Sequence, residues 1–258
     1  MFIDSNFEKI KFLSPKISAF KLLRTHGYKN KENIKKKILE SAEKALERLT
    51  TYSSPVGYFY IEEIKKKSLN RIQLDRTCLK CEVFKEIFSE SNFLIIFIIS
   101  LGKGIDRKLK TISKDTNEPL GALFLENASW LALELILRDA RSRIIDFAKS
   151  KNMQIENRMA PGYSYPSKIL KKRIMWQLEE QENLFKLFEN RNICIRLTES
   201  FTMLPRMSRS GVFGLKKIKF KTVFKFRFGA RFRTRTGTTF RSRDFKSLVS
   251  TKFHQAGI

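Results

Sequence analysis

The sequence has little of several residue types, and each scarcity excludes a class of protein. Three cysteines and two histidines among 258 residues are too few for a disulfide framework or for a zinc site built from paired ligands. The most apolar run, Phe93 to Ile99, is far shorter than the roughly 20 residues that a helix needs to cross a bilayer. The first residues lack the basic and apolar segments of a cleavable signal. We therefore expect a cytoplasmic protein with no membrane span.

Acidic residues are scarce in the last part of the chain. The formal net charge is +26, and residues 216–258 alone carry +12, because 13 lysines and arginines face a single acid, Asp244. Basic and apolar side chains alternate there, for example from Lys217 to Lys221. Interleaved cations and aromatic rings can neutralise phosphates and stack on bases. The same alternation suits an anionic membrane surface.

The abrupt change of composition after Gly214 allows other interpretations of this segment. Its restricted vocabulary of Phe, Lys and Arg fits translation in a shifted reading frame, which would have removed the protein's own last strands. It also fits an additional solvated hairpin. We therefore divide the chain into a folded domain, residues 1–215, and a basic aromatic tail, residues 216–258, which is either native or frame-shifted.

The spacing of apolar residues predicts a series of helices and strands. Helical periodicity follows Asn30, which suits an N-cap, and continues to Thr51. Further helices are expected at residues 83–88, 118–149 and 167–188, and strands at residues 56–64, 93–99 and 193–197. Because helices and strands mix without regular alternation, the expected class is α+β, with helices packed around a twisted, mainly antiparallel sheet.

Two polar blocks in the second half of the chain predict a small-molecule site. Arg158 and the following Ala160-Pro161-Gly162-Tyr163, expected to form a loop, join a fixed cation to a turn whose backbone can approach a ligand. Further along, residues 196–205 supply a polar strand that ends at a proline. Each residue also has an ordinary structural interpretation: Arg158 as a surface arginine, and Tyr163 as a ring packed on the turn.

Three other groups favour structural interpretations. Ser100 to Gly104 has two glycines but no complete nucleotide fingerprint, so a strand-end turn is expected. Cys78 and Cys81 lack a second ligand pair and are expected to be ordinary thiols. Cys194 lies in an apolar stretch, which predicts a core residue.

These blocks, taken in order, resemble the activation domain of vitamin B12-dependent methionine synthase, including its free-standing versions. The resemblance covers about residues 17 to 215, and its most specific parts are the last two blocks. The matching landmarks are Leu23-Arg24-x-x-Gly27-Tyr28, Ser100-Leu101-Gly102 with Asp106-Arg107, Arg158-x-x-Pro161-Gly162-Tyr163, and Arg196-Leu197-Thr198-Glu199-Ser200-Phe201 with Met203, Pro205, Ser208, Ser210 and Gly211.

The resemblance implies binding of S-adenosylmethionine and help in restoring an oxidised cobalamin. It implies ligand contacts from Arg158, Ala160 and Tyr163, with Glu134 on the preceding helix in support; Glu134 otherwise suits a surface or ion-paired carboxylate. A separate corrinoid-binding methionine synthase or methyltransferase would carry the cobalamin, and a flavodoxin-like protein would supply the electron. Such a site mainly orients two reactants, which agrees with a sequence that shows no convincing catalytic dyad.

The sequence departs from the family at two points. An acidic residue expected early in the domain and a tyrosine expected near its C-terminal strand have no match here. Two alternatives therefore stay open: a basic nucleic-acid-binding protein that acts through its tail, and a degenerate family member without activity.

Overall fold

The computed structural model describes residues 6–114 and 118–218. The interpretations placed on the tail beyond residue 218, including nucleic-acid binding and a shifted reading frame, lie outside the described residues. The last described strand runs through Lys217, two residues past the domain boundary expected at residue 215.

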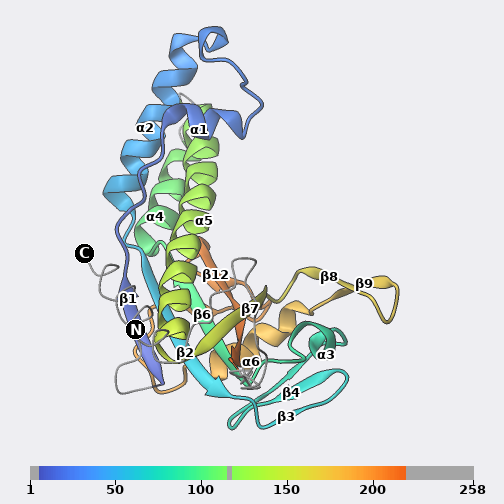
Figure 1. Cartoon of the computed structure of the whole chain (residues 1–258). Helices are drawn as coiled ribbons and strands as arrows, with labels where there is room; N and C mark the ends of the chain where they lie inside the picture. Colours follow the sequence, from blue (N-terminus) through green and yellow to red (C-terminus); the bar gives the residue numbers. More distant parts are fainter. Residues whose placement is uncertain (1–5, 115–117, 219–258) are drawn as a thin grey trace, which may run out of the picture. The chain divides into compact units, whose positions relative to one another are not determined.

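A five-stranded sheet organises the described chain (Figure 1). Its strand order is β1 (Phe7–Lys11), β2 (Val56–Glu63), β6 (Phe93–Ser100), β12 (Ser208–Lys217) and β7 (Met153–Met159). Every neighbouring pair is antiparallel. The expected α+β class with a mainly antiparallel sheet is confirmed.

Strand β6 lies at the centre of the sheet and is buried on both faces. Successive side chains of a strand point to opposite faces. Ile95 and Phe97 accordingly belong to one hydrophobic cluster, and Leu94 and Ile96 to another. Two covered faces explain why this segment is a continuous apolar run rather than an alternating one.

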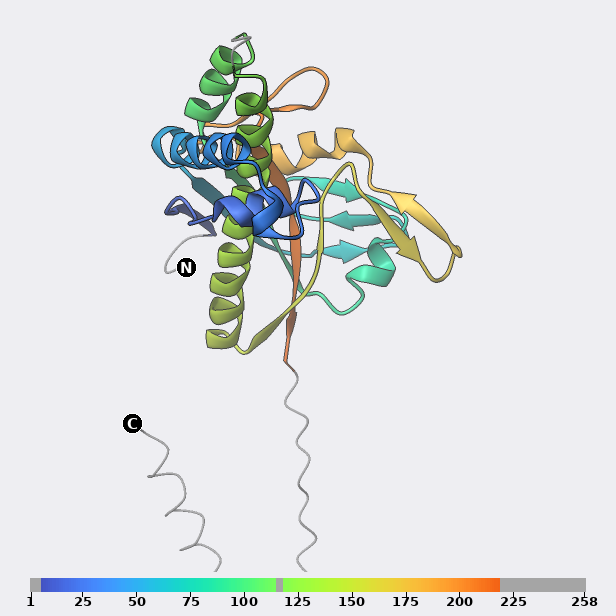
Figure 2. The same ribbon diagram turned by 90° about the horizontal axis from the view of Figure 1, so that it is seen from above.

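Four helices lie on one side of the sheet (Figure 2). They are α1 (Ala19–Arg24), α2 (Lys36–Tyr52), α4 (Lys103–Ile112) and α5 (Pro119–Ser150). Helix α5 packs on the sheet itself, and the other three pack against α5. Small buried residues of α5, such as Ala128 and Ala132, let it pack closely in this cluster. Gly104 serves the same purpose in α4, because a Cβ atom there would collide with the main-chain oxygen of Tyr52.

Helix α5 confirms the long helix expected at residues 118–149. Among the described residues it is the helix whose length and apolar composition would suffice to cross a membrane. Its burial against the sheet and α2 accounts for that composition. Helix α2 begins at Lys36 rather than near Asn30, and a single 3₁₀ turn, Lys31–Asn33, fills the interval.

The other face is covered by short elements. They are β3 (Lys66–Lys67), β4 (Arg71–Gln73), β5 (Cys78–Lys80), α3 (Phe84–Ile87), the hairpin β8 (Ser164–Ser167) and β9 (Lys172–Met175), a 3₁₀ turn (Leu178–Glu180), α6 (Gln181–Lys186), and the hairpin β10 (Arg196–Leu197) and β11 (Met203–Leu204). Their core contains the fully buried Trp176, whose ring lies edge-on to Phe84 with centroids 5.1 Å apart.

The sequence predictions for this second face were partly wrong. Residues 167–188 form a hairpin and only the short helix α6, because Ile174 and Trp176 alternate toward the core with the period of a strand. The strand expected at residues 193–197 is limited to β10. Cys194 is exposed rather than a core residue, and its Sγ lies 3.3 Å from the Tyr58 hydroxyl.

Candidate functional site

A pocket of about 440 Å³ lies where strand β7 ends before its neighbour β12. Met159, the last residue of β7, pairs with Val212. Residues 208–211 of β12 therefore extend past the end of β7, and the chain turns away at Pro161. Arg158 lies within β7 and not in a loop, which corrects the sequence prediction.

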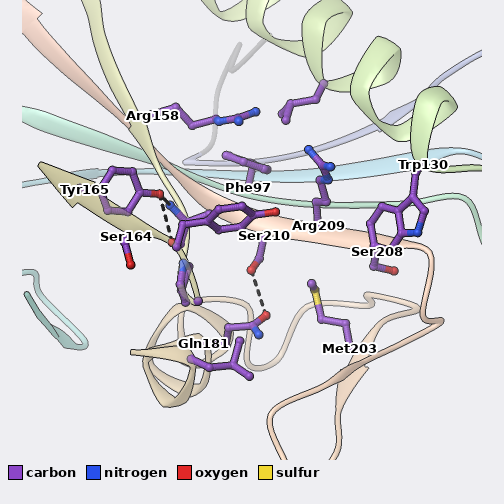
Figure 3. Close-up of a pocket in the computed structure, with 16 residues that line it drawn as sticks. Phe97, Trp130, Arg158, Ser164, Tyr165, Gln181, Met203, Ser208, Arg209 and Ser210 are labelled. Carbon is purple, nitrogen blue, oxygen red and sulfur yellow. Dashed lines mark hydrogen bonds between the residues drawn. The ribbon is translucent and has the colours of Figure 1, made fainter. Parts of the chain in front are cut away.

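The pocket wall combines apolar rings with a few polar groups, as is usual for small-molecule sites. Its volume lies within the range typical of such sites, roughly 300–1,000 Å³. The lining residues are Phe97, Trp130, Leu137, Arg158, Ala160, Pro161, Gly162, Tyr163, Ser164, Tyr165, Leu178, Gln181, Met203, Ser208, Arg209 and Ser210 (Figure 3). Three of the four residues expected to contact a ligand, Arg158, Ala160 and Tyr163, thus line one pocket.

Arg158 and Arg209 project from the same face of the sheet. Arg158 is paired with Phe213, so the two side chains share a face, and Arg209 lies four residues before Phe213 on the same strand. Figure 3 shows both guanidinium groups directed toward α5, with Met203 and Gln181 across the pocket in that view. The site therefore has two fixed positive charges on one side.

The turn after Arg158 is anchored to the end of the β8–β9 hairpin. The Gly162 N–H donates to the Trp176 carbonyl oxygen at 2.7 Å, and the Trp176 N–H donates to the Tyr163 carbonyl oxygen at 2.9 Å. Gly162 has a φ of 82°, which favours glycine. This geometry leaves Tyr163 at the rim of the pocket with 55% of its surface exposed.

The Tyr165 hydroxyl forms hydrogen bonds with the main chain of Ala160. The Ala160 N–H donates to the Tyr165 hydroxyl oxygen at 2.7 Å, and that hydroxyl lies 3.2 Å from the Ala160 carbonyl oxygen as its donor. Burial raises the pKa of Tyr165, and the Ala160 hydrogen bond acts in the opposite direction. The phenol therefore stays protonated near neutral pH. The carbonyl oxygen of Ala160 keeps a second lone pair for a ligand.

Glu134 is not among the lining residues, although it lies on α5 between Trp130 and Leu137, which are. Its Oε2 is 2.7 Å from Nη1 of Arg209, and its Oε1 is 3.9 Å from Nε of Arg138. The structure thus gives this carboxylate the ion-paired position that the sequence left open. Its role as a ligand contact stays a prediction.

Sequence reasoning missed Arg209, Trp130 and Gln181 as lining residues. Arg209 lies between Ser208 and Ser210 in the last sequence block. Because side chains alternate along a strand, Arg209 faces the opposite side from the two serines, and this alternation was the available signal. Gln181 is buried and connects two segments: Ser210 Oγ donates to its Oε1 at 3.0 Å, and its Nε2 donates to the Phe201 carbonyl oxygen at 2.9 Å.

The remaining sequence candidates have structural roles. Residues 196–205 form the β10–β11 hairpin and not one strand. Gly102 precedes the first turn of α4, and the Asp106 carboxylate of that turn accepts the Arg206 main-chain N–H at 2.6 Å. In the part of the chain that the structure describes, no cluster of three His, Cys, Asp or Glu residues is placed to hold a metal.

The fold and the pocket define an α+β domain with a pocket, lined by two arginines, at one edge of an antiparallel sheet. No protein-family model and no curated protein matches the sequence. Among solved structures, the fold is similar to that of the MetH reactivation domain in its crystal structure bound to AdoHcy. The TM-score is 0.57 and the identity 14%, over 81% of this chain and 78% of that chain. At this identity the likeness concerns the fold.

Proposed function

We propose that the chain binds an S-adenosyl ligand in this pocket and acts as an activation module for a cobalamin-dependent methionine synthase. The observation that carries the proposal is the position of Arg158, Ala160 and Tyr163 around one pocket. Support comes from the fold, which resembles that of a domain crystallised with AdoHcy, and from the sequence motifs that resemble those of the activation-domain family.

Each part of the pocket suits a part of such a ligand. Arg158 has no ion-pair partner among the described residues, so its planar fork is available to an amino-acid carboxylate. Phe97, Trp130 and Met203 supply apolar surface for an adenosine moiety. The chain's contribution to methyl transfer is to bind and orient the donor, which lowers the entropic cost of bringing two reactants together.

Because this chain would only bind and orient the donor, partner proteins would have to supply the cobalamin and the electron. A corrinoid-binding methionine synthase or methyltransferase would carry the cobalamin, which supplies the nucleophile for the methyl group. A flavodoxin-like protein would supply the electron that restores it. The pocket's exposed rim at Tyr163 offers a surface from which a bound donor can be reached.

Calorimetry with AdoHcy and S-adenosylmethionine tests the proposal. We expect Arg158→Ala to weaken binding of both ligands about 10- to 100-fold, because each loses a charge-assisted hydrogen bond to its carboxylate. Arg141→Ala is the matched control, since Arg141 lies exposed on α5 outside the pocket. Absence of binding to the wild-type protein, or equal affinities of wild type and Arg158→Ala, contradicts the proposal and favours the degenerate-member alternative.

A further inference from the structure

The charged residues that line the pocket are basic rather than acidic. Its lining residues include two arginines, Arg158 and Arg209, and neither aspartate nor glutamate. Guanidinium groups keep their proton at any pH at which the protein is folded. A ligand in this pocket therefore meets two permanent positive charges on one side.

Arg209 is held in place by its neighbours. Its Nη1 is bound to Glu134 at 2.7 Å, and its guanidinium carbon lies 5.6 Å from the centroid of the Trp130 ring. Its Nε is buried and has no hydrogen-bond partner among the described residues. A cation fixed by an ion pair and an aromatic face cannot move out of the pocket without losing both contacts.

The same contacts engage the carboxylate that borders the pocket. Both oxygens of Glu134 face arginines, Arg209 at 2.7 Å and Arg138 at 3.9 Å. Its negative charge is thus paired with protein cations, of which Arg209 lines the pocket. Arg158 contributes a further charge that has no counter-ion among the described residues.

S-adenosylmethionine and AdoHcy, the two ligands of the proposed function, differ in the charge of their sulfur atom. S-adenosylmethionine carries a sulfonium, an ammonium and a carboxylate, so its net charge is positive. AdoHcy has a neutral thioether in place of the sulfonium and no net charge. Like charges in a site partly excluded from water repel more strongly than in bulk solvent.

We infer that Arg209 is a specificity-determining residue, which makes the pocket prefer the neutral thioether AdoHcy over the cationic sulfonium donor. The inference rests on the proposed function and refines its ligand class. Release of Glu134 from Arg209 would return a negative charge to the pocket wall and favour the donor. The Arg209–Glu134 pair thus sets which of the two ligands the resting protein holds.

The ratio of the two dissociation constants tests this role. In the wild-type chain we expect AdoHcy to bind about 10-fold more tightly than S-adenosylmethionine. Arg209→Met should bring the ratio close to one, because it removes the charge and frees Glu134. Arg209→Lys keeps the charge and should retain the preference. Glu134→Gln leaves Arg209 uncompensated and should increase the preference.

A ratio measured within one variant cancels general damage to the pocket, and thermal unfolding of each variant reports its folding. The inference is overturned if the wild-type chain binds S-adenosylmethionine as tightly as AdoHcy, or if Arg209→Met leaves the ratio unchanged. In both cases ligand binding persists, so the proposed function survives. If neither ligand binds to any of the folded variants, the inference and the proposed function fail together.

Discussion

The two faces of the five-stranded sheet are stabilised in different ways. The helical face depends on packing: α5 buries small and apolar residues in one cluster with β6, and α4 approaches the main chain of α2 closely at Gly104. The opposite face uses acidic side chains that bind the main chain of distant segments. Glu86 accepts the Lys168 N–H at 2.8 Å, and Glu180 accepts the Lys80 N–H at 2.7 Å. A helix satisfies its main-chain hydrogen bonds within itself, whereas short strands and turns need partners from distant parts of the chain to hold them in position.

The pocket lies where these two kinds of structure meet. Leu137 and Trp130 come from α5 on the helical face, and Leu178 and Gln181 come from the short elements of the other face. Arg158 and Arg209 come from the sheet between them. A site at such a junction can have a rigid side that positions charges and a second side built from turns.

Substitution of two adjacent residues of β6 compares the faces directly. Ile95 and Ile96 are both fully buried but point to opposite faces. We expect Ile95→Ala and Ile96→Ala each to lower the free energy of unfolding by about 2–5 kcal/mol, measured by urea denaturation. A loss below about 1 kcal/mol for either variant would show that the face concerned is not a packed core.

A smaller effect should follow from crowding the helical face at Gly104. A Cβ atom there would meet the main-chain oxygen of Tyr52, which cannot move as a flexible side chain does. We expect Gly104→Ala to cost about 1–3 kcal/mol of the free energy of unfolding. Lys110→Ala, at an exposed position of the same helix, is the control and should change it by less than about 0.5 kcal/mol. Equal stabilities of the two variants would contradict the close contact.

The smallest expected effect is a pH-dependent change at Glu86, on the face of the sheet opposite the helices. Hydrogen bonds from Ser167 and from the main chain of Lys168 and Ile169 lower the pKa of Glu86. A lowered folded-state pKa gives stability that is present above the ordinary value of 4.5 and lost as the pH falls through the lower folded value. The amide proton shifts of Lys168 and Ile169 should therefore change below about pH 4.5, and Glu86→Gln should remove this titration. An unchanged profile in Glu86→Gln would assign the transition to another group.

Sequence reasoning succeeded where the pattern is local and failed where the partner is distant. Helix α5 and strand β6 follow from periodicity and apolar content alone. Residues 167–188, which contain β9, were predicted as a helix, because the carboxylate that holds the turn between β8 and β9, Glu86, lies more than eighty residues earlier in the chain. For the same reason Cys194 was expected in the core, although the Tyr58 hydroxyl binds its main-chain N–H at the surface.

The candidate site shows the same division. The Pro-Gly turn and the cation before it are neighbours in the sequence, so Arg158, Ala160 and Tyr163 could be predicted together as candidate ligand contacts. Arg209 was missed because its importance comes from the unequal lengths of β7 and β12, which place it past the end of β7, on the same face as Arg158, only after the sheet has formed. Its pairing with Glu134 joins residues 75 positions apart, a distance at which no sequence periodicity operates.

The central position of β6 has a consequence during synthesis of the chain. Its partner β12 is made about 110 residues later, since Ser100 pairs with Ser208. At a typical translation rate this corresponds to about 5 to 20 seconds in which a strongly apolar strand has an open edge. Until then, β2 and the early helices have to protect this strand from neighbouring nascent chains, and a chaperone that binds extended apolar segments would find its best target there.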